Sequence, residues 1–279
     1  MDLVLDIADE YFLDKVWAAL VPVSAFIENV NRTLIDEPVT MWNTSSHVVS
    51  SSAWLDIVSH LPHPPITTNV LSAANLPPIS AWPRDYWPRQ LLSLSVITLV
   101  GIHVLYFLFA YLSYRFIFNH EIMKHPRFLK DQVRLEIICS LKAFPAMAVL
   151  MLPFFMAEIN GYSKMYKDVN DYGWGYLVFS IVLFLIFTDY GIYWIHRWEH
   201  HPICYKWLHK PHHKWLVPTP FASYAFNPLD GFAQSLPYHF FPFIFPLHQK
   251  VFLGFFVFVN FWTILASSSN GNVERARNA

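Results

Sequence analysis

Three long apolar runs limit what this chain can fold into more than any other feature. They cover residues 92–118, 137–157 and 175–195, and each contains a single Asp, Glu, Lys or Arg. A helix needs about 20 apolar residues to cross the hydrocarbon core of a bilayer. Each run is therefore long enough to span a membrane as a helix.

A fourth apolar region covers residues 238–265. It is broken by Pro242, by Pro246 and by a polar pair at 249–250. The region is either one tilted span or a short interfacial piece followed by a span at 251–265, because proline interrupts a helix. The expected fold is thus an all-α polytopic membrane bundle of about four apolar segments.

Composition agrees with a membrane protein. The chain is 54% hydrophobic and only 14% charged, whereas soluble domains carry about 25% charged residues. The net charge of −1 provides no basic field for nucleic acid. Two cysteines, Cys139 and Cys204, are too few for a disulfide framework.

Lys and Arg residues indicate how the spans are oriented. Four of them lie in the loop 119–136, and Arg197, Lys206, Lys210 and Lys214 follow the third span. Positively charged loops stay in the cytosol, so residues 1–91 are expected to form a lumenal N-terminal segment. Two glycosylation sequons, at Asn31 and Asn43, fall in that segment and agree with this orientation.

Histidines cluster directly after the third span, in the sequence HRWEHHPICYKWLHKPHH. Residues four apart share one face of a helix, as His196 and His200 would. The second group has spacings of three and four. The six histidines between residues 196 and 213 are His196, His200, His201, His209, His212 and His213.

This pattern predicts metal binding, because imidazole is a good ligand for iron, zinc, copper and nickel. A loosely binding or incidental histidine tract is the plainer alternative. Six histidines overfill a single tetrahedral zinc site, so two neighbouring metal ions fit better. Open positions on imidazole-bound iron suit dioxygen chemistry. The position at the cytosolic mouth of the bundle suggests oxidation of a lipid.

The motifs HRWEHH, HKPHH and KWLVPTPFASYAFNPLDGFAQSLPYH resemble the fatty acid hydroxylase/sterol desaturase superfamily. Within it, the run from TPFAS to QSLPYH is most similar to fungal Δ7-sterol C5(6)-desaturases. Two further stretches, at 125–137 and 236–265, resemble the same group. The likeness covers about residues 80–265, which we expect to hold a membrane desaturase-type domain at 92–265.

The resemblance implies an oxidoreductase of ergosterol biosynthesis in the endoplasmic reticulum membrane, with its histidine boxes in the cytosol. Such an enzyme uses two non-haem iron ions, dioxygen, and electrons from NAD(P)H through cytochrome b5 and its reductase. It introduces a C5=C6 double bond into a Δ7-sterol. The motif makes His196, His200 and His201 the first box, with either His200 or His201 as a ligand. The second box is then His209, His212 and His213.

Five further residues are candidates for supporting the metal or the substrate. Asp189 could accept a ring N–H from a ligand histidine, as outer carboxylates do, or make a helix–helix contact instead. Asp230 and Gln234 could orient box residues, although loop structure explains them equally well. Thr219, in PTPFAS, and His239 are the remaining candidates, and His239 also suits an interfacial position.

Two departures from the family pattern bear on activity. The family continues with a third histidine box, whereas residues 266–279 read ASSSNGNVERARNA and contain no histidine. With incomplete coordination, we expect this polypeptide to be inactive or nearly so. Tyr224 and Asn227 also stand where the family has histidines. The alternatives are a C4-methyl oxidase or other lipid hydroxylase, and a non-catalytic truncated membrane paralogue.

Overall fold

The computed structural model describes residues 1–26, 53–65 and 79–268. Both sequons and most of the polar tail lie outside these residues. The chain divides into two compact units. One is Leu3–Ser93, and the other combines Met1–Asp2 with Leu94–Ala279.

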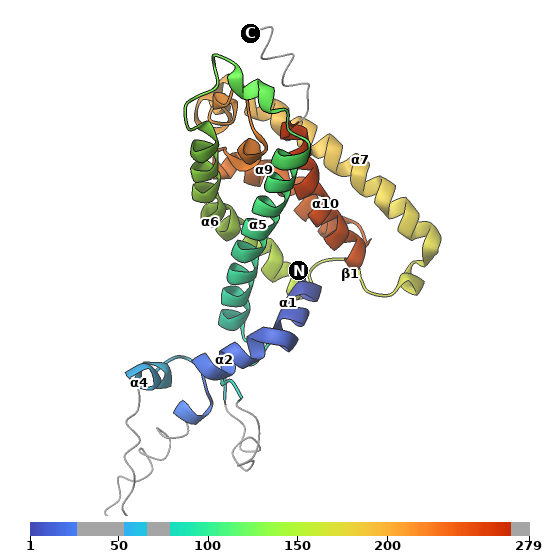
Figure 1. The fold of residues 1–279 in the computed structure, drawn as a ribbon. Coiled ribbons are helices and arrows are strands. Elements are labelled where there is room, and N and C mark those ends of the chain that lie inside the picture. The colour runs from blue at the N-terminus through green and yellow to red at the C-terminus, as the bar shows by residue number, and fades with distance from the viewer. Residues whose placement is uncertain (27–52, 66–78, 269–279) are drawn as a thin grey trace, which may run out of the picture. The chain divides into compact units, whose positions relative to one another are not determined.

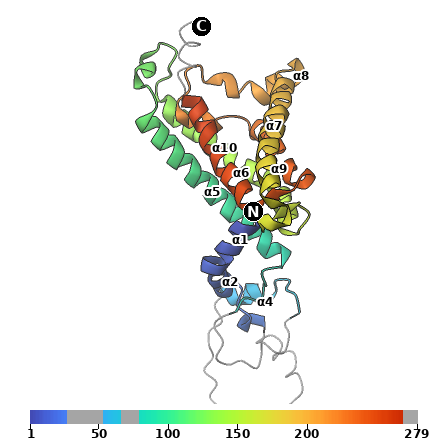
Figure 2. The ribbon, with the colours of Figure 1, turned by 90° about the vertical axis from the view of Figure 1, so that its right-hand side faces the viewer.

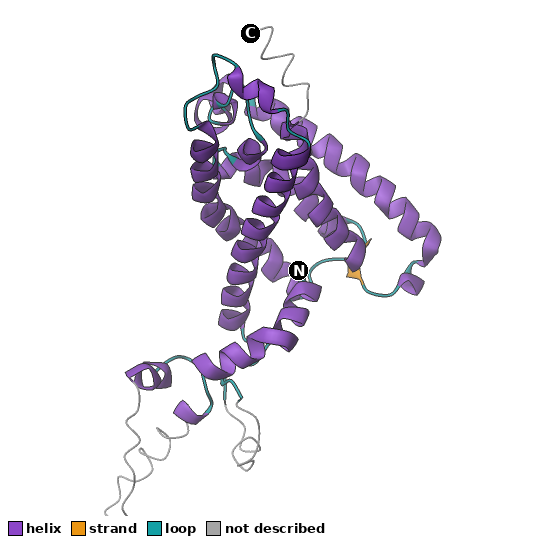
Figure 3. Ribbon diagram, in the orientation of Figure 1, coloured by secondary structure: helices purple, strands orange, loops and turns teal. Residues whose placement is uncertain are grey.

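Helices make up nearly all regular structure in the larger unit (Figure 3). The long ones are α5 (Trp87–Phe116), α6 (Gln132–Ile159), α7 (Gly173–Glu199), α9 (Pro228–Ile244) and α10 (Gln249–Ser268). Figure 1 shows their arrangement. Four of them, α5, α6, α7 and α10, are long and apolar enough to cross a membrane. The predicted all-α membrane fold is therefore confirmed.

The spanning helices expose apolar side chains at helical spacing. Val96, Val100 and Val104 lie on one face of α5 and are 55–57% exposed. Residues four apart share a face, and a continuous exposed apolar stripe is unusual in a soluble protein. This face suits contact with lipid.

The fourth apolar region forms two helices, so the alternative of a single tilted span is wrong. α9 has 17 residues and packs against α6 and α7, where a Cβ added at Gly191 of α7 would lie 2.7 Å from Cγ of Pro237. It is part of the bundle rather than a peripheral piece. After α9, the two-residue strand β2 (Leu247–His248) pairs in parallel with β1 (Met165–Tyr166), and α10 follows.

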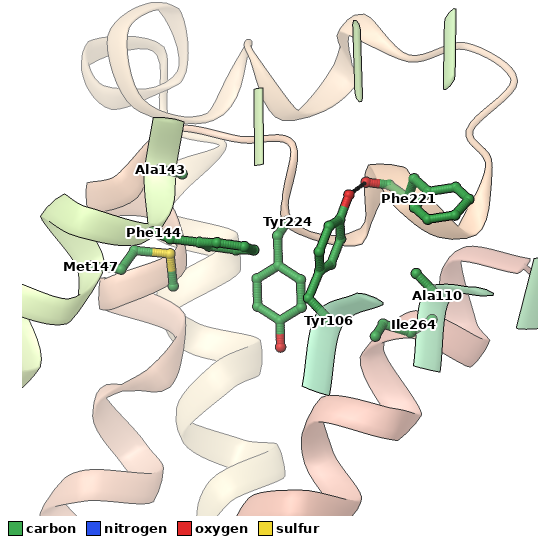
Figure 4. Close-up of a cluster of buried hydrophobic side chains, with 8 residues drawn as sticks. All are labelled: Tyr106, Ala110, Ala143, Phe144, Met147, Phe221, Tyr224 and Ile264. Atoms are coloured by element: carbon green, nitrogen blue, oxygen red, sulfur yellow. Dashed lines mark hydrogen bonds between the residues drawn. The ribbon is translucent and has the colours of Figure 1, made fainter. Parts of the chain in front are cut away.

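A core of aromatic side chains ties the segment after the histidines to the bundle. Tyr106 of α5 donates a hydrogen bond to the carbonyl oxygen of Phe221 (2.9 Å). The cluster combines α5, α6, α10 and the 3₁₀ helix η7 (Pro220–Tyr224) (Figure 4). Its buried members are Tyr106, Ala110, Ala143, Phe144, Met147, Phe221, Tyr224 and Ile264.

The two ends of the bundle carry different segments. Asp2 pairs with Lys167 in the α6–α7 connection at 2.9 Å. At the opposite end of α6, the Gln132 amide donates to the carbonyl oxygen of Val217 at 2.7 Å. Met1–Asp2 and the histidine-rich segment therefore lie at opposite ends of the larger unit.

The smaller unit contains α1 (Asp2–Ala8), a π-helical turn η1 (Asp9–Leu13), α2 (Asp14–Leu20) and α4 (Ala53–Ser59). A buried ion pair holds it together. The Arg89 guanidinium lies 2.7 Å from the Asp9 carboxylate and 2.5 Å from that of Asp14. The rings of Trp17 and Trp82 pack nearby at 5.4 Å.

Candidate metal centre

The end of α7 and the turns after it gather the histidines. His196 and His200 lie one helical turn apart. His200 is the C-cap of α7, and its backbone N–H donates a hydrogen bond to the carbonyl oxygen of His196. Pro202 then opens the short helix α8 (Pro202–Cys204), at one end of α7 in Figure 2. A π-helical turn η5 (Tyr205–His209) and a 3₁₀ turn η6 (His212–Lys214) follow. These short turns bring the second group of histidines back to the first.

His209 lies at the centre of the cluster. Its ring centroid is 4.6 Å from that of His196, 4.5 Å from His200, 5.2 Å from His212 and 4.8 Å from His213. The Nε2 atoms of His196 and His200 are 3.1 Å apart. His196, His200 and His209 each offer a nitrogen within 4.8 Å of the others. Five of the six predicted box histidines thus converge.

His201 is the box histidine that stays outside the cluster. It is exposed and stands at the start of α8. Its carbonyl oxygen accepts the N–H groups of Cys204 and Tyr205, and the structure records no contact of its ring with the other five. Of the two alternatives for the first box, the structure brings His200 to the site.

The imidazoles of His209, which is buried, and His212, which is half-buried, are in the form that binds metal. Burial and the neighbouring histidines together lower the pKa of His209 to about 4, burial being the larger cause. Burial lowers the pKa of His212 to about 4 as well. Both rings are therefore neutral near pH 7, and neutral imidazole is the form that ligates metal. The Nε2 atom of His209 is buried without a hydrogen-bond partner among the described residues.

Acidic side chains contact the other edge of His209. Its Nδ1 atom is 2.9 Å from Oδ2 of Asp230. The Gln234 amide donates to Oδ1 of Asp230 at 2.7 Å and to Oε2 of Glu199 at 3.1 Å. The structure thus brings Asp230 and Gln234 to the histidines. Glu199 was not foreseen, although it lies within the HRWEHH motif and three residues after His196.

Three predicted candidates lie elsewhere. Asp189 is exposed on α7, and the structure records no hydrogen bond from it to a described histidine. Thr219 is buried and donates its hydroxyl proton to the Glu136 carboxylate of α6. His239 is buried between Phe154 and Phe155, with ring centroids at 5.4 and 5.5 Å.

Tyr224 and Asn227, at the positions where the resemblance places histidines, have structural contacts. The Tyr224 hydroxyl donates to the Asn260 side chain on α10. The Asn227 side chain accepts the N–H of Leu229 at 3.0 Å and so caps α9. These contacts fix the segment between the histidine cluster and Asp230.

The side chains present fit a bound transition metal. Two imidazole nitrogens approach to 3.1 Å, the central ring has an unpartnered Nε2, and its Nδ1 is held by a carboxylate. Ligand histidines usually have such a partner on the second nitrogen.

Comparisons with known proteins agree with this chemistry. The model of the fatty acid hydroxylase family matches residues 181–277. The Δ7-sterol 5(6)-desaturase of Gibberella zeae is 44% identical over 267 residues, which are 95% of this chain and 72% of that protein. A probable Δ7-sterol 5(6)-desaturase of Neurospora crassa is 46% identical over 268 residues, 95% of this chain and 73% of that protein.

Mammalian relatives match a shorter stretch. The lathosterol oxidase of Rattus norvegicus is 53% identical over 187 residues, 66% of this chain and 62% of that protein. The chain therefore spans less than two thirds of the mammalian relatives that it matches. No solved structure matches it. Because the identity to the fungal enzymes extends along nearly the whole chain, this protein belongs to the fatty acid hydroxylase family.

Proposed function

We propose that the protein is an oxidoreductase that introduces the C5=C6 double bond into a Δ7-sterol. The identity of 44–46% to fungal Δ7-sterol 5(6)-desaturases over 95% of the chain carries this proposal. The convergence of five imidazoles beside a bundle of apolar helices supports it. We expect the protein in the endoplasmic reticulum membrane, with the histidines on the cytosolic side.

The residues have distinct tasks in this proposal. A pair of bound non-haem iron ions would supply the dioxygen chemistry that removes two hydrogens from the sterol. His196, His200, His209, His212 and His213 would hold them. Asp230 accepts a hydrogen bond from Nδ1 of His209, which directs the lone pair of Nε2 toward His196 and His200. Cytochrome b5 and its reductase would deliver electrons from NAD(P)H at this end.

The 279-residue polypeptide by itself holds fewer histidines at the site than the family pattern provides. Six lie in its two boxes, and the structure gathers five. A third histidine box of the family type would add ligands to this site.

A sterol profile tests the function. The chain would be expressed in yeast that lacks its own C5-desaturase, beside a version whose tail is replaced by a family-like third histidine box. His209→Ala would be made in both, with the exposed His60→Ala as a matched control at equal protein levels. We expect C5(6)-unsaturated sterol from the extended chain and its His60→Ala variant. Failure of the extended chain, when well expressed, would contradict the sterol assignment.

A further inference from the structure

Glu199 is a buried acid beside the histidines that the proposed mechanism does not use. It lies in the last turn of α7, and its side chain is fully buried. One carboxylate oxygen, Oε2, accepts the Gln234 amide at 3.1 Å and is 3.7 Å from Nδ1 of His209. The other, Oε1, has no hydrogen-bond partner among the described residues. A buried polar atom without a partner costs free energy, so this oxygen points to a ligand.

A second carboxylate lies beside the first. Glu199, His209 and Asp230 each offer a ligand atom within 4.8 Å of the others, and all three are buried. The Gln234 amide bonds to both acids and holds them in place. Among the described residues, no lysine or arginine is recorded within ion-pair distance of either acid, and the His209 ring that contacts both is neutral near pH 7. Two neighbouring buried carboxylates are costly unless a cation offsets their charge.

We infer that Glu199 is a metal ligand, and that its Oε1, unpartnered among the described residues, adds a carboxylate to a cation position next to His196, His200 and His209. This inference rests on the proposed function, since it concerns the second metal ion of the same centre. Mixed carboxylate and imidazole ligands suit a divalent ion such as Fe²⁺ or Mn²⁺. The box histidines alone do not fill the coordination positions of a second cation. Glu199 would supply one of the missing ligands from within this chain.

Metal titration of the purified full chain in lipid nanodiscs tests this. Fe²⁺ would be added without oxygen to the wild type and to Glu199→Gln, which keeps the side-chain volume. The matched control is Glu136→Gln, because Glu136 is also fully buried but has hydrogen bonds from Gln132 and Thr219. We expect Glu199→Gln to weaken one binding step by about tenfold or more. Glu199→Gln should keep the other binding step, which is the one that a His200→Ala variant should lose. Glu136→Gln should bind Fe²⁺ like the wild type.

A second measurement needs no variant. An infrared difference spectrum of the wild type, loaded minus metal-free, should contain carboxylate bands, because carboxylate stretching changes when the group binds a metal. Equal Fe²⁺ binding by wild type and Glu199→Gln, or a difference spectrum without carboxylate bands, would overturn the inference. In that case Glu199 and Asp230 share a proton instead. If the wild type binds no Fe²⁺ at all, the result would contradict the proposed function as well as the role of Glu199.

Discussion

Oδ2 of Asp230 lies 2.9 Å from Nδ1 of His209, and both side chains are fully buried. The two residues come from different elements: His209 ends a π-helical turn, whereas Asp230 stands in the first turn of α9. The contact therefore fixes the central imidazole to a helix of the bundle. It also leaves Nε2 of His209 free to face the other histidines.

Asp230→Ala should reduce metal affinity by about 10–100-fold, the usual loss when the partner of a ligand histidine is removed. Competition with a chromophoric chelator would measure it. Asp230→Asn should lose less, because its amide oxygen can still accept the proton of Nδ1. The control is Asp189→Ala, which removes an exposed carboxylate of α7. Equal losses in Asp189→Ala and Asp230→Ala would contradict the role of Asp230.

Neighbouring histidines should differ in their importance for metal binding. Both His200 and His201 are exposed, but the ring of His200 is 4.5 Å from that of His209, whereas the structure records no contact between the ring of His201 and the other box histidines. We expect His200→Ala to lower the metal content of the purified protein and His201→Ala to leave it unchanged. Elemental analysis of the two variants, prepared in parallel, measures this. A deficit in His201→Ala alone would show that the box binds metal through the other histidine.

The sequence predicts the bundle well, because a run of about 20 apolar residues has few alternatives to a spanning helix. Its boundaries are less predictable. The second run was expected at 137–157, but α6 begins at Gln132. The third was expected to end at 195, but α7 continues to Glu199. Polar residues at the end of a spanning helix continue its backbone hydrogen bonds, but they lower the local hydropathy. A prediction from hydropathy therefore ends the helix too early.

The histidine cluster follows from spacing, but its acidic partners follow only in part, because Asp230 was among the candidates and Glu199 was not. Asp189 is seven residues before His196, about 10 Å along the helix axis, and too far to reach its ring. Asp230 reaches His209 because α9 packs against α7. Glu199 is buried by the same packing, and one sequence alone does not indicate such tertiary contacts.

Thr219→Val should destabilise the protein by about 1–3 kcal/mol, the cost of leaving a buried polar group without its partner. The Thr219 hydroxyl donates to the Glu136 carboxylate, which is itself fully buried. Thermal unfolding in detergent measures the change. Thr188→Val is the matched control, since that hydroxyl donates to the carbonyl oxygen of Phe184 in its own helix at 2.8 Å. A larger loss in the control would refute the importance of the Glu136 contact.

Gly191→Ala should also destabilise the bundle, by about 1–3 kcal/mol, the usual cost of overpacking. An added Cβ would lie 2.7 and 2.9 Å from Cγ and Cβ of Pro237 on α9. The proline ring is too stiff to move aside, so α7 and α9 must separate. The same helices carry His196 and Asp230, so metal affinity should fall as well.

Gly175→Ala is the control for this change, because nothing lies within 4 Å of an added Cβ at Gly175 of α7. Alanine favours a helix over glycine by about 1 kcal/mol, so this variant should unfold at the wild-type temperature or slightly above it. Thermal unfolding and metal titration of both variants decide the matter. If Gly191→Ala gains stability as Gly175→Ala does, the close approach of α7 to Pro237 does not limit the packing. If it loses stability but keeps its metal affinity, the separation of the helices does not reach the histidine cluster.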